Sequence, residues 1–325
     1  MTLLSIIIPV YNRVTLIKLT LESIRNQSNC DFECMIVDDN STDGTWEFLE
    51  EFCSSDNRFK AIQKPPHIKK GPSSSRNFGL RQTRGEYVHF FDSDDLVPPD
   101  FYLKCFEKIG KNNFDFFSVR IRWFSEEDPE GLLSPKFSHD EFIDRAITRK
   151  HDIWTQNVIW RRDLLDRCPN FNESITMSED ILFAVEAMKT ADHFSFCNDL
   201  YVSVRRHSQS LTFQNNLERN IARQDSVFNA YLQIFNLISK QTTHTTEAQK
   251  YCMTKLYLSL SELYEMRQVN TTNIHRLAVI TRLFVKNNEW RLLLKSILFL
   301  PIKSIIKQHY KQTKIKKNNL PNTTN

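Results

Sequence analysis

The amino-acid sequence predicts an α/β fold, with a mostly parallel central sheet covered by helices on both faces and a helical C-terminal region. Short β-branched runs alternate with helical patterns from residue 4 to about residue 100, and this alternation is typical of a parallel sheet. All six glycines lie at or before Gly131, which indicates a change of architecture in the second half. There, the pattern is strongly helical from about Phe213 to Ile306.

The first part of the chain contains four strand patterns separated by three helical patterns. The run "LSIIIPV" is almost wholly apolar, as expected of a buried strand. The first helical pattern places Leu16, Leu19, Leu21 and Ile24 on or near one face. We predict strands at residues 4–10, 34–39, 59–63 and 87–91, and helices at 15–27, 45–53 and 73–84.

The pattern becomes mixed beyond about residue 100. We predict a helix at 100–110, one or two strands at 114–124, a helix at 177–191, a strand at 194–207, and helices over 213–306 with breaks near 241–246 and 270–273. These patterns divide the chain into a first domain (1–212), a helical region (213–308) and a basic tail (309–325) that we expect to be disordered.

The composition is that of a soluble globular protein. The chain has 325 residues, 40% of them hydrophobic and 25% charged, and its net charge of +4 does not by itself call for nucleic acid. Seven cysteines without a CxxC pair fit reduced thiols in the cytosol. We expect neither a secretory signal, since a basic n-region is missing, nor a spanning helix, since no run of about 18 apolar residues occurs.

Polar side chains follow the predicted strands where each strand ends. Such residues are commonly turn formers or helix caps. The carboxyl ends of parallel strands meet at one edge of a sheet, where ligands bind, so four clusters at one edge favour a binding site. The clusters are Pro9, Tyr11, Asn12 and Arg13; Asp38, Asp39, Asn40, Ser41 and Asp43; Arg76 and Asn77, which we expect to open a helix after the "KKGPSSS" loop; and Asp92, Ser93, Asp94 and Asp95.

The last cluster, "DSDD", raises an electrostatic problem. Asp92, Asp94 and Asp95 repel one another, and a fold tolerates this only with a counter-charge or with water around a solvated turn. A hard cation such as Mg²⁺ or Mn²⁺ accepts carboxylate oxygens and can bridge a diphosphate. The sequence has neither GxxxxGK[ST] nor GxGxxG, so the two glycine-rich modes of phosphate binding lack support.

Five motifs in register resemble the inverting glycosyltransferases of family 2, which have the GT-A fold. They are "SIIIPVYNR", "IVDDNSTDGT", "KKGPSSSRNFGL", "GEYVHFFDSDD" and "SEDILF", and the resemblance covers roughly residues 3–212. It implies a metal-dependent hexosyltransferase that uses a nucleotide diphosphate donor, UDP-hexose or UDP-N-acetylhexosamine. The implied acceptor is a hydroxyl of a glycan or lipid-linked molecule in capsule or lipopolysaccharide synthesis.

The resemblance also implies roles for individual residues. For the nucleotide it implies Pro9, Tyr11, Asn12, Asp39, Arg76 and Asp92, with Tyr11 stacking and Asp39 accepting from the base. For the metal, Mn²⁺ or Mg²⁺, it implies Asp94 together with Asp92.

For catalysis, the resemblance makes Asp180 the general base that deprotonates the acceptor hydroxyl. Glu179 is the alternative base, since either side chain could face the acceptor. The bland alternative for both acids is the first turn of a helix, where carboxylates are stabilising.

Looser matches extend the site. "VRRHSQSLT" resembles an Arg-x-His-x-x-Ser segment, so Arg205, His207 and Ser210 are expected to contact the diphosphate or the acceptor; a solvated strand edge is the alternative. Trp154 and Trp160 flank the acceptor-side segment and could stack on a sugar or pack in the core. We expect His89 to be a structural core histidine.

The C-terminal end has two open interpretations. Residues 290–317 combine an apolar run with eight basic residues and no acid, which suits an anionic membrane surface, where each basic residue contributes about 1 kcal/mol. The alternative is a last packed helix followed by a solvated tail. We therefore expect a cytoplasmic protein, peripheral on the inner face of the cytoplasmic membrane in the first case. Two alternatives to the enzyme function are a catalytically silent nucleotide-sugar-binding scaffold and, more weakly, a nucleic-acid binder.

Overall fold

The structure is a computed structural model that describes residues 4–27, 30–110, 112–207, 216–239, 245–266, 271–289 and 292. The chain forms two compact units, Met1–Gln214 and Asn215–Asn325, which are described separately. The domain borders predicted from the sequence, at 212/213 and 308/309, stay predictions, and the predicted tail lies outside the described residues.

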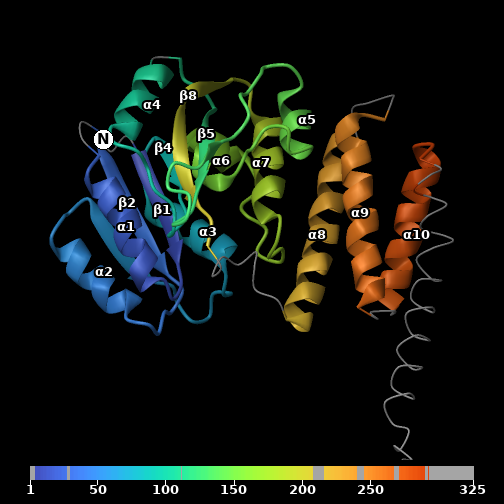
Figure 1. Cartoon of the computed structure of the whole chain (residues 1–325), viewed down its shortest axis with the longest axis horizontal. Helices are drawn as coiled ribbons and strands as arrows, with labels where there is room; N and C mark the ends of the chain where they lie inside the picture. The colour runs from blue at the N-terminus through green and yellow to red at the C-terminus, as the bar shows by residue number, and fades with distance from the viewer. Residues whose placement is uncertain are drawn as a thin grey trace, which may run out of the picture. The chain divides into compact units, whose positions relative to one another are not determined.

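The first unit is built on one eight-stranded sheet (Figure 1). Its strand order is β3-β2-β1-β4-β7-β5-β6, and β8 pairs with β5. The pairs among β1 to β4, and the β5–β8 pair, are parallel, whereas β7 runs antiparallel between β4 and β5. The strands are β1 (Leu4–Val10), β2 (Phe32–Asp38), β3 (Phe59–Gln63), β4 (Tyr87–Phe90), β5 (Phe116–Phe124), β6 (Leu132–Leu133), β7 (Val158–Arg161) and β8 (Phe194–Arg205).

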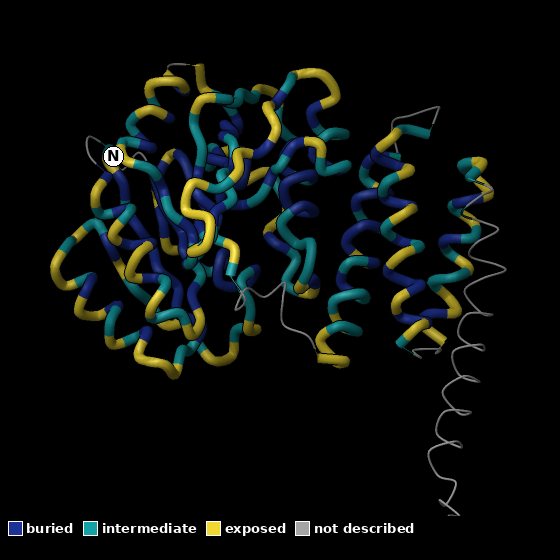
Figure 2. Tube along the Cα trace, viewed as in Figure 1, coloured by how far each residue is buried: buried dark blue, intermediate teal, exposed yellow. Residues whose placement is uncertain are grey.

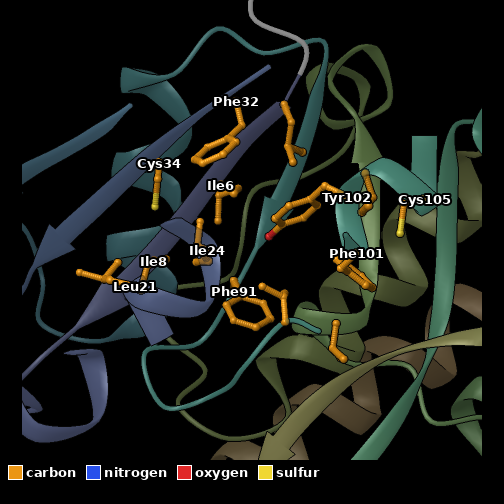
Figure 3. Packing of buried hydrophobic residues seen from close by; sticks show 14 of the residues in the cluster. Ile6, Ile8, Leu21, Ile24, Phe32, Cys34, Phe91, Phe101, Tyr102 and Cys105 are labelled. Atoms are coloured by element: carbon orange, nitrogen blue, oxygen red, sulfur yellow. The ribbon is translucent and has the colours of Figure 1, made fainter. Parts of the chain in front are cut away.

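Helices cover both faces of this sheet, so the predicted α/β architecture is confirmed. In β1, Ile6 and Ile8 join the core formed with α1, α2 and α4, where Leu21, Phe101 and Tyr102 also pack (Figure 3). Ile7 points the other way, against Gly79 of α3. The helices are α1 (Val14–Arg25), α2 (Thr45–Ser54), α3 (Pro72–Gln82), α4 (Phe101–Ile109), α5 (Phe142–Ile147), α6 (Arg162–Arg167) and α7 (Glu179–Thr190), with a 3₁₀ turn, η1 (Thr155–Asn157).

The close packing of α3 against β1 and β2 depends on Gly79. A Cβ atom there would lie 2.6 Å from Cγ2 of Ile7 and 3.1 Å from Cγ2 of Val37. Pro72 stands at the first helical position, where its fixed φ suits a helix and its missing N–H is not needed. The helix therefore begins at Pro72, and Arg76 lies in its second turn instead of opening it.

The register brings the carboxyl ends of the strands together. Val10 pairs with Asp38, and Ile7 with Phe90, so the segments after β1, β2 and β4 leave the sheet at the same edge. Strands β1, β2 and β4 are almost wholly buried (Figure 2). Polar groups just beyond them are therefore fixed to a rigid support.

The second unit is helical in its described part, as predicted. It consists of α8 (Leu217–Ile238), α9 (Glu247–Glu265) and α10 (Thr271–Lys286). At the start of α9, Thr246 and Gln249 form a reciprocal capping box, which satisfies backbone N–H groups that a helix start leaves without partners. Among the described helices, none has an apolar stretch of sufficient length to cross a membrane. The segment 290–317 lies outside the described residues apart from Leu292.

Candidate functional site

The loops after β1 and β2 are tied together by polar contacts. The Asn12 N–H donates to Oγ of Ser41 (2.9 Å), and Oδ1 of Asn12 accepts from the Thr42 N–H (2.7 Å). Asn12 has a φ of 48°, a left-handed conformation that asparagine tolerates better than most residues. Asn12 thus shapes the edge of the sheet through contacts within the protein.

Asp39 lies beside a lysine that the sequence analysis did not single out. The buried Nζ of Lys64 is 2.7 Å from Oδ1 of Asp39, and the Gly71 N–H donates to Oδ2 (2.7 Å). Lys64 also donates to Oγ of Ser74 (2.9 Å) and of Ser75 (3.0 Å). These bonds join the end of β2 to the start of α3.

Tyr11 and Pro9 lie at the same edge. The Tyr11 side chain is 48% exposed, and Nζ of Lys70 is 5.4 Å from the centre of its ring. Pro9 is partly buried in β1. An exposed aromatic ring at this edge can stack on a planar ligand.

A buried arginine gathers acids from two distant segments. Nη2 of Arg76 lies 2.7 Å from Oδ1 of Asp92, and its Nη1 lies 3.6 Å from Oε1 of Glu179. Arg76 is 4% exposed. Burial alone would lower its pKa, but the charges of Asp92 and Glu179 outweigh burial and raise it.

The acids around Arg76 repel one another. Burial and the charge of Asp180 raise the pKa of Glu179 to about 7, although Arg76 opposes this. Burial also raises the pKa of Asp92, against Arg76 and together with the charges of Asp94 and Asp180. Asp92, Asp94, Glu179 and Asp180 therefore form one electrostatic cluster, which we call the acidic cluster.

The acidic cluster continues to the end of β8. Nε2 of His207 lies 3.0 Å from Oδ2 of Asp94. Nε of Arg205 donates to the Asp94 carbonyl (3.1 Å), and the backbone N–H of Arg205 donates to Oδ1 of Asp95 (2.9 Å). Burial and the charges of Asp94 and Asp92 raise the pKa of Asp95 well above its usual range.

Glu179 and Asp180 occupy the first turn of α7. The preceding residue, Ser178, has a φ of 67° and its side chain makes no capping hydrogen bond. Carboxylates in a first turn are stabilised by the helix dipole, but the contact with Arg76 shows that Glu179 also belongs to the acidic cluster.

Three other predicted residues have different surroundings. His89 is buried between the Tyr102 hydroxyl (3.0 Å) and the Gln156 carbonyl (2.9 Å), and burial lowers its pKa to about 4, as expected of a core histidine. Trp160 is 1% exposed and packs in the core. Trp154 is half-buried beside Trp123. Ser210 lies outside the described residues.

Asn77, which the sequence grouped with Arg76, has an internal partner. Its Nδ2 donates to the Phe171 carbonyl (2.9 Å) and to Oε1 of Glu173 (2.9 Å), and its Oδ1 accepts from the Phe171 N–H (3.0 Å). Asn77 therefore attaches α3 to the segment before α7. That attachment helps to place Glu179 beside Arg76.

The donor chemistry of the acidic cluster fits Mn²⁺ or Mg²⁺. Carboxylate oxygens suit both ions, and an imidazole nitrogen such as that of His207 suits Mn²⁺ as well. Among the described residues, no group of three or more His, Cys, Asp and Glu side chains is arranged to hold a metal ion. A pair of protein ligands completed by phosphate oxygens is the usual way in which Mg²⁺ is bound with a nucleotide.

A mostly parallel sheet with acids, an arginine and an exposed aromatic at its carboxyl edge defines an α/β protein with a ligand site of the nucleotide-binding kind. The chain belongs to glycosyl transferase family 2, whose family model matches residues 5–168. It spans between 20% and 63% of the length of the first three curated relatives it matches.

One curated relative and two solved structures are similar to this chain over more of its length. The GalNAc(5)-diNAcBac-PP-undecaprenol β-1,3-glucosyltransferase of Campylobacter jejuni is 25% identical over 81% of this chain and 84% of its own. The structure of S. aureus TarS 1–349 in complex with UDP-GlcNAc is 20% identical, covers 96% of this chain and 92% of that chain, and has a TM-score of 0.64. The mannosyltransferase PcManGT of Pyrobaculum calidifontis, solved with GDP-Man and Mn²⁺, covers 93% and 86% with a TM-score of 0.53 and 16% identity. The predicted GT-A fold is thereby confirmed.

Proposed function

We propose that the protein is a metal-dependent inverting glycosyltransferase that transfers a sugar from a UDP-hexose or UDP-N-acetylhexosamine to a hydroxyl of a glycan or lipid-linked acceptor. Family membership and the UDP-GlcNAc complex of the TarS neighbour support a nucleotide-sugar donor. The name of the Campylobacter relative supports a lipid-linked acceptor and, with it, a role in bacterial surface polysaccharide synthesis such as capsule or lipopolysaccharide. The single observation that carries the proposal is the acidic cluster around Arg76 at the carboxyl edge of the sheet.

The donor nucleotide would bind across the ends of β1 and β2. Tyr11 would stack on the base, and Asp39, held by Lys64 and the Gly71 N–H, would accept from a base N–H. Pro9 and Asn12 would shape this pocket. Arg76 would keep Asp92 oriented toward the ribose and metal, since its guanidinium already lies against that carboxylate.

Asp94 and His207 are the proposed protein ligands of the metal, with Asp92 beside them. Nε2 of His207 and Oδ2 of Asp94 lie 3.0 Å apart. Two side chains this close could both bind one metal ion in place of their contact with each other. When bound, Mn²⁺ or Mg²⁺ would offset the negative charge that develops on the departing diphosphate. Arg205 would fix the Asp94 backbone through its bond to the Asp94 carbonyl.

Asp180 is the proposed general base. It would take the proton of the acceptor hydroxyl while the hydroxyl oxygen forms a bond to the anomeric carbon and the bond from that carbon to the diphosphate breaks on the opposite side. Glu179 is the alternative base because its pKa of about 7 suits proton transfer. We favour Asp180, since Glu179 already pairs with Arg76.

The test measures transfer of radiolabelled sugar from UDP-hexoses and UDP-N-acetylhexosamines to a bacterial lipid-linked glycan extract. Asp180→Asn should reduce transfer at least about 100-fold and leave UDP binding nearly intact. Glu186→Gln is the matched control, because Glu186 lies on the same helix and burial also raises its pKa to about 7. Transfer that survives both Asp180→Asn and Glu179→Gln would contradict the assignment of the base. A donor that binds without any transfer would favour the silent scaffold.

Peripheral membrane binding on the cytoplasmic face is a separate part of the proposal and rests on the basic, apolar segment 290–317. Truncation after Trp290 should abolish co-sedimentation with vesicles containing phosphatidylglycerol. If the truncated chain sediments as the full chain does, this part fails and the enzyme proposal is unaffected.

A further inference from the structure

Two tryptophans and two arginines from three segments form a continuous cluster in the first unit. The rings of Trp123 and Trp154 are perpendicular, with centroids 5.8 Å apart. The guanidinium of Arg149 lies 4.5 Å from the centre of the Trp154 ring, and that of Arg206 lies 5.0 Å from the Trp123 ring. We call these four residues the Trp–Arg cluster.

The Trp–Arg cluster and the acidic cluster are connected through the chain segment at the end of β8. Arg206 stands between Arg205 and His207, both of which contact Asp94. The Arg206 N–H donates to the Phe124 carbonyl (2.7 Å), directly after Trp123. Because β5 and β8 run parallel to one another and in the direction of β4, the cluster lies at the sheet edge that carries Asp92 and Asp94.

Arg206 is the most accessible side chain of the Trp–Arg cluster. Arg206 is exposed, and Arg149, Trp123 and Trp154 are half-buried. The guanidinium of Arg206 stacks on Trp123 through its face, and the in-plane N–H donors of a guanidinium match phosphate or carboxylate oxygens. The indole rings offer flat apolar surface beside these donors.

Electrostatics indicate which ligand such a surface would favour. The carboxylates of the acidic cluster repel any anion that approaches the reacting centre, and a divalent metal bound by Asp94 and His207 would offset them on the donor side. A neutral acceptor would need no cations here, whereas an anionic acceptor would need them on its own side of the site. Arg149 and Arg206 supply that positive charge.

We propose that the Trp–Arg cluster is an acceptor subsite that recognises an anionic sugar, one that carries a phosphate ester or a carboxylate near the hydroxyl to be glycosylated. The inference rests on the proposed function and adds to it the chemical class of the acceptor. Arg149 and Arg206 bind the anion, and Trp123 and Trp154 contact the apolar face of the sugar.

The experiment measures binding of three probes by isothermal titration calorimetry, with UDP and Mn²⁺ saturating so that the donor site is filled. The probes are N-acetylglucosamine 1-phosphate, glucuronic acid and uncharged N-acetylglucosamine. At least one charged probe should bind about tenfold more tightly than the uncharged sugar, and which one it is distinguishes phosphate from carboxylate recognition. The double variant Arg149→Gln/Arg206→Gln should lose this difference, and Arg84→Gln, at an exposed arginine, should retain it.

Thermal stabilisation by UDP and Mn²⁺ is measured on each variant as well. Unchanged UDP stabilisation shows that a variant is folded and that its donor site is intact. Equal binding of charged and uncharged probes, no binding of either charged probe, or a preference that survives the double variant would each overturn the subsite. If the wild type does not bind UDP in the presence of Mn²⁺, the result instead contradicts the proposed function.

Discussion

The Nε2 atom of His207 lies 3.0 Å from the Oδ2 atom of Asp94, although the two residues are 113 positions apart in the chain. If they are ligands of one metal ion, His207→Asn should raise the Mn²⁺ concentration needed for half-maximal UDP stabilisation about 10–100-fold, as losses around metal sites usually do. His193→Asn, at an exposed histidine of the same unit, is the control. An unchanged Mn²⁺ requirement in His207→Asn would exclude His207 as a ligand.

Arg76 compensates the buried acids of two segments. Arg76→Met should lower the free energy of unfolding by about 3–5 kcal/mol, because Asp92 and Glu179 would then lack their counter-charge. Arg76→Lys keeps the positive charge but loses the forked guanidinium, so its free energy of unfolding should lie between those of the wild type and Arg76→Met. Urea denaturation measures both, with Arg84→Met as the exposed control. A loss below about 1 kcal/mol, the usual value for a surface pair, would show that Arg76 does not hold the acidic cluster together.

The buried pair of Lys64 and Asp39 at the other end of the site leads to a similar prediction. Lys64→Met leaves the Asp39 carboxylate buried without its cation and should destabilise the fold by about 3–5 kcal/mol, with weaker UDP binding. The double variant Lys64→Met/Asp39→Asn should recover part of the stability, since no unpaired charge remains. Lys60→Met, at an exposed position of the preceding strand β3, is the control for urea denaturation. Equal stability of the single and double variants would mean that the two side chains are not coupled.

Glu179 predicts a pH dependence of stability. Its pKa in the folded protein, about 7, lies above the value of about 4.3 expected in the unfolded chain, so the folded state binds the proton more tightly between these values. The contribution of Glu179 is fully present below about pH 4.3 and is lost as the pH rises through 7. It amounts to at most about 4 kcal/mol.

The measurement is the stability difference between wild type and Glu179→Gln, from urea denaturation at pH 5 to 8 without metal or nucleotide. The wild type should lose stability relative to the variant as the pH rises. Glu50→Gln, at an exposed glutamate, should show no such trend. A difference that is constant with pH would mean that Glu179 titrates as an ordinary surface acid.

Local patterns were sufficient for most of the sheet. The predicted bounds of β1 and β3 match the structure, because an apolar run such as "LSIIIPV" specifies a buried strand without help from distant residues. The convergence of Asp39, Arg76 and Asp92 at one edge was also predictable, since it follows from parallel pairing alone.

Long-range partners were not predictable in the same way. β7 spans only four residues, Val158–Arg161, and its antiparallel place between β4 and β5 depends on pairing with segments about 40 and 70 residues earlier. Lys64 was missed because lysine is almost never buried, although its position directly after β3 was a usable signal. The pairing of Arg76 with Glu179 required the fold that brings α3 and α7 together.

The most direct test of the central claim is thermal stabilisation by UDP and UDP-N-acetylglucosamine, with and without Mn²⁺, in wild type and Asp94→Asn. A ligand at about 100 times its dissociation constant adds about 2.7 kcal/mol of stability, which is readily measured. The proposed donor site predicts stabilisation that requires Mn²⁺ and is lost in Asp94→Asn but kept in Asp163→Asn, at a largely exposed acid. No stabilisation by nucleoside diphosphates or nucleotide sugars, with the metal present, would contradict the donor site and the enzymatic function derived from it.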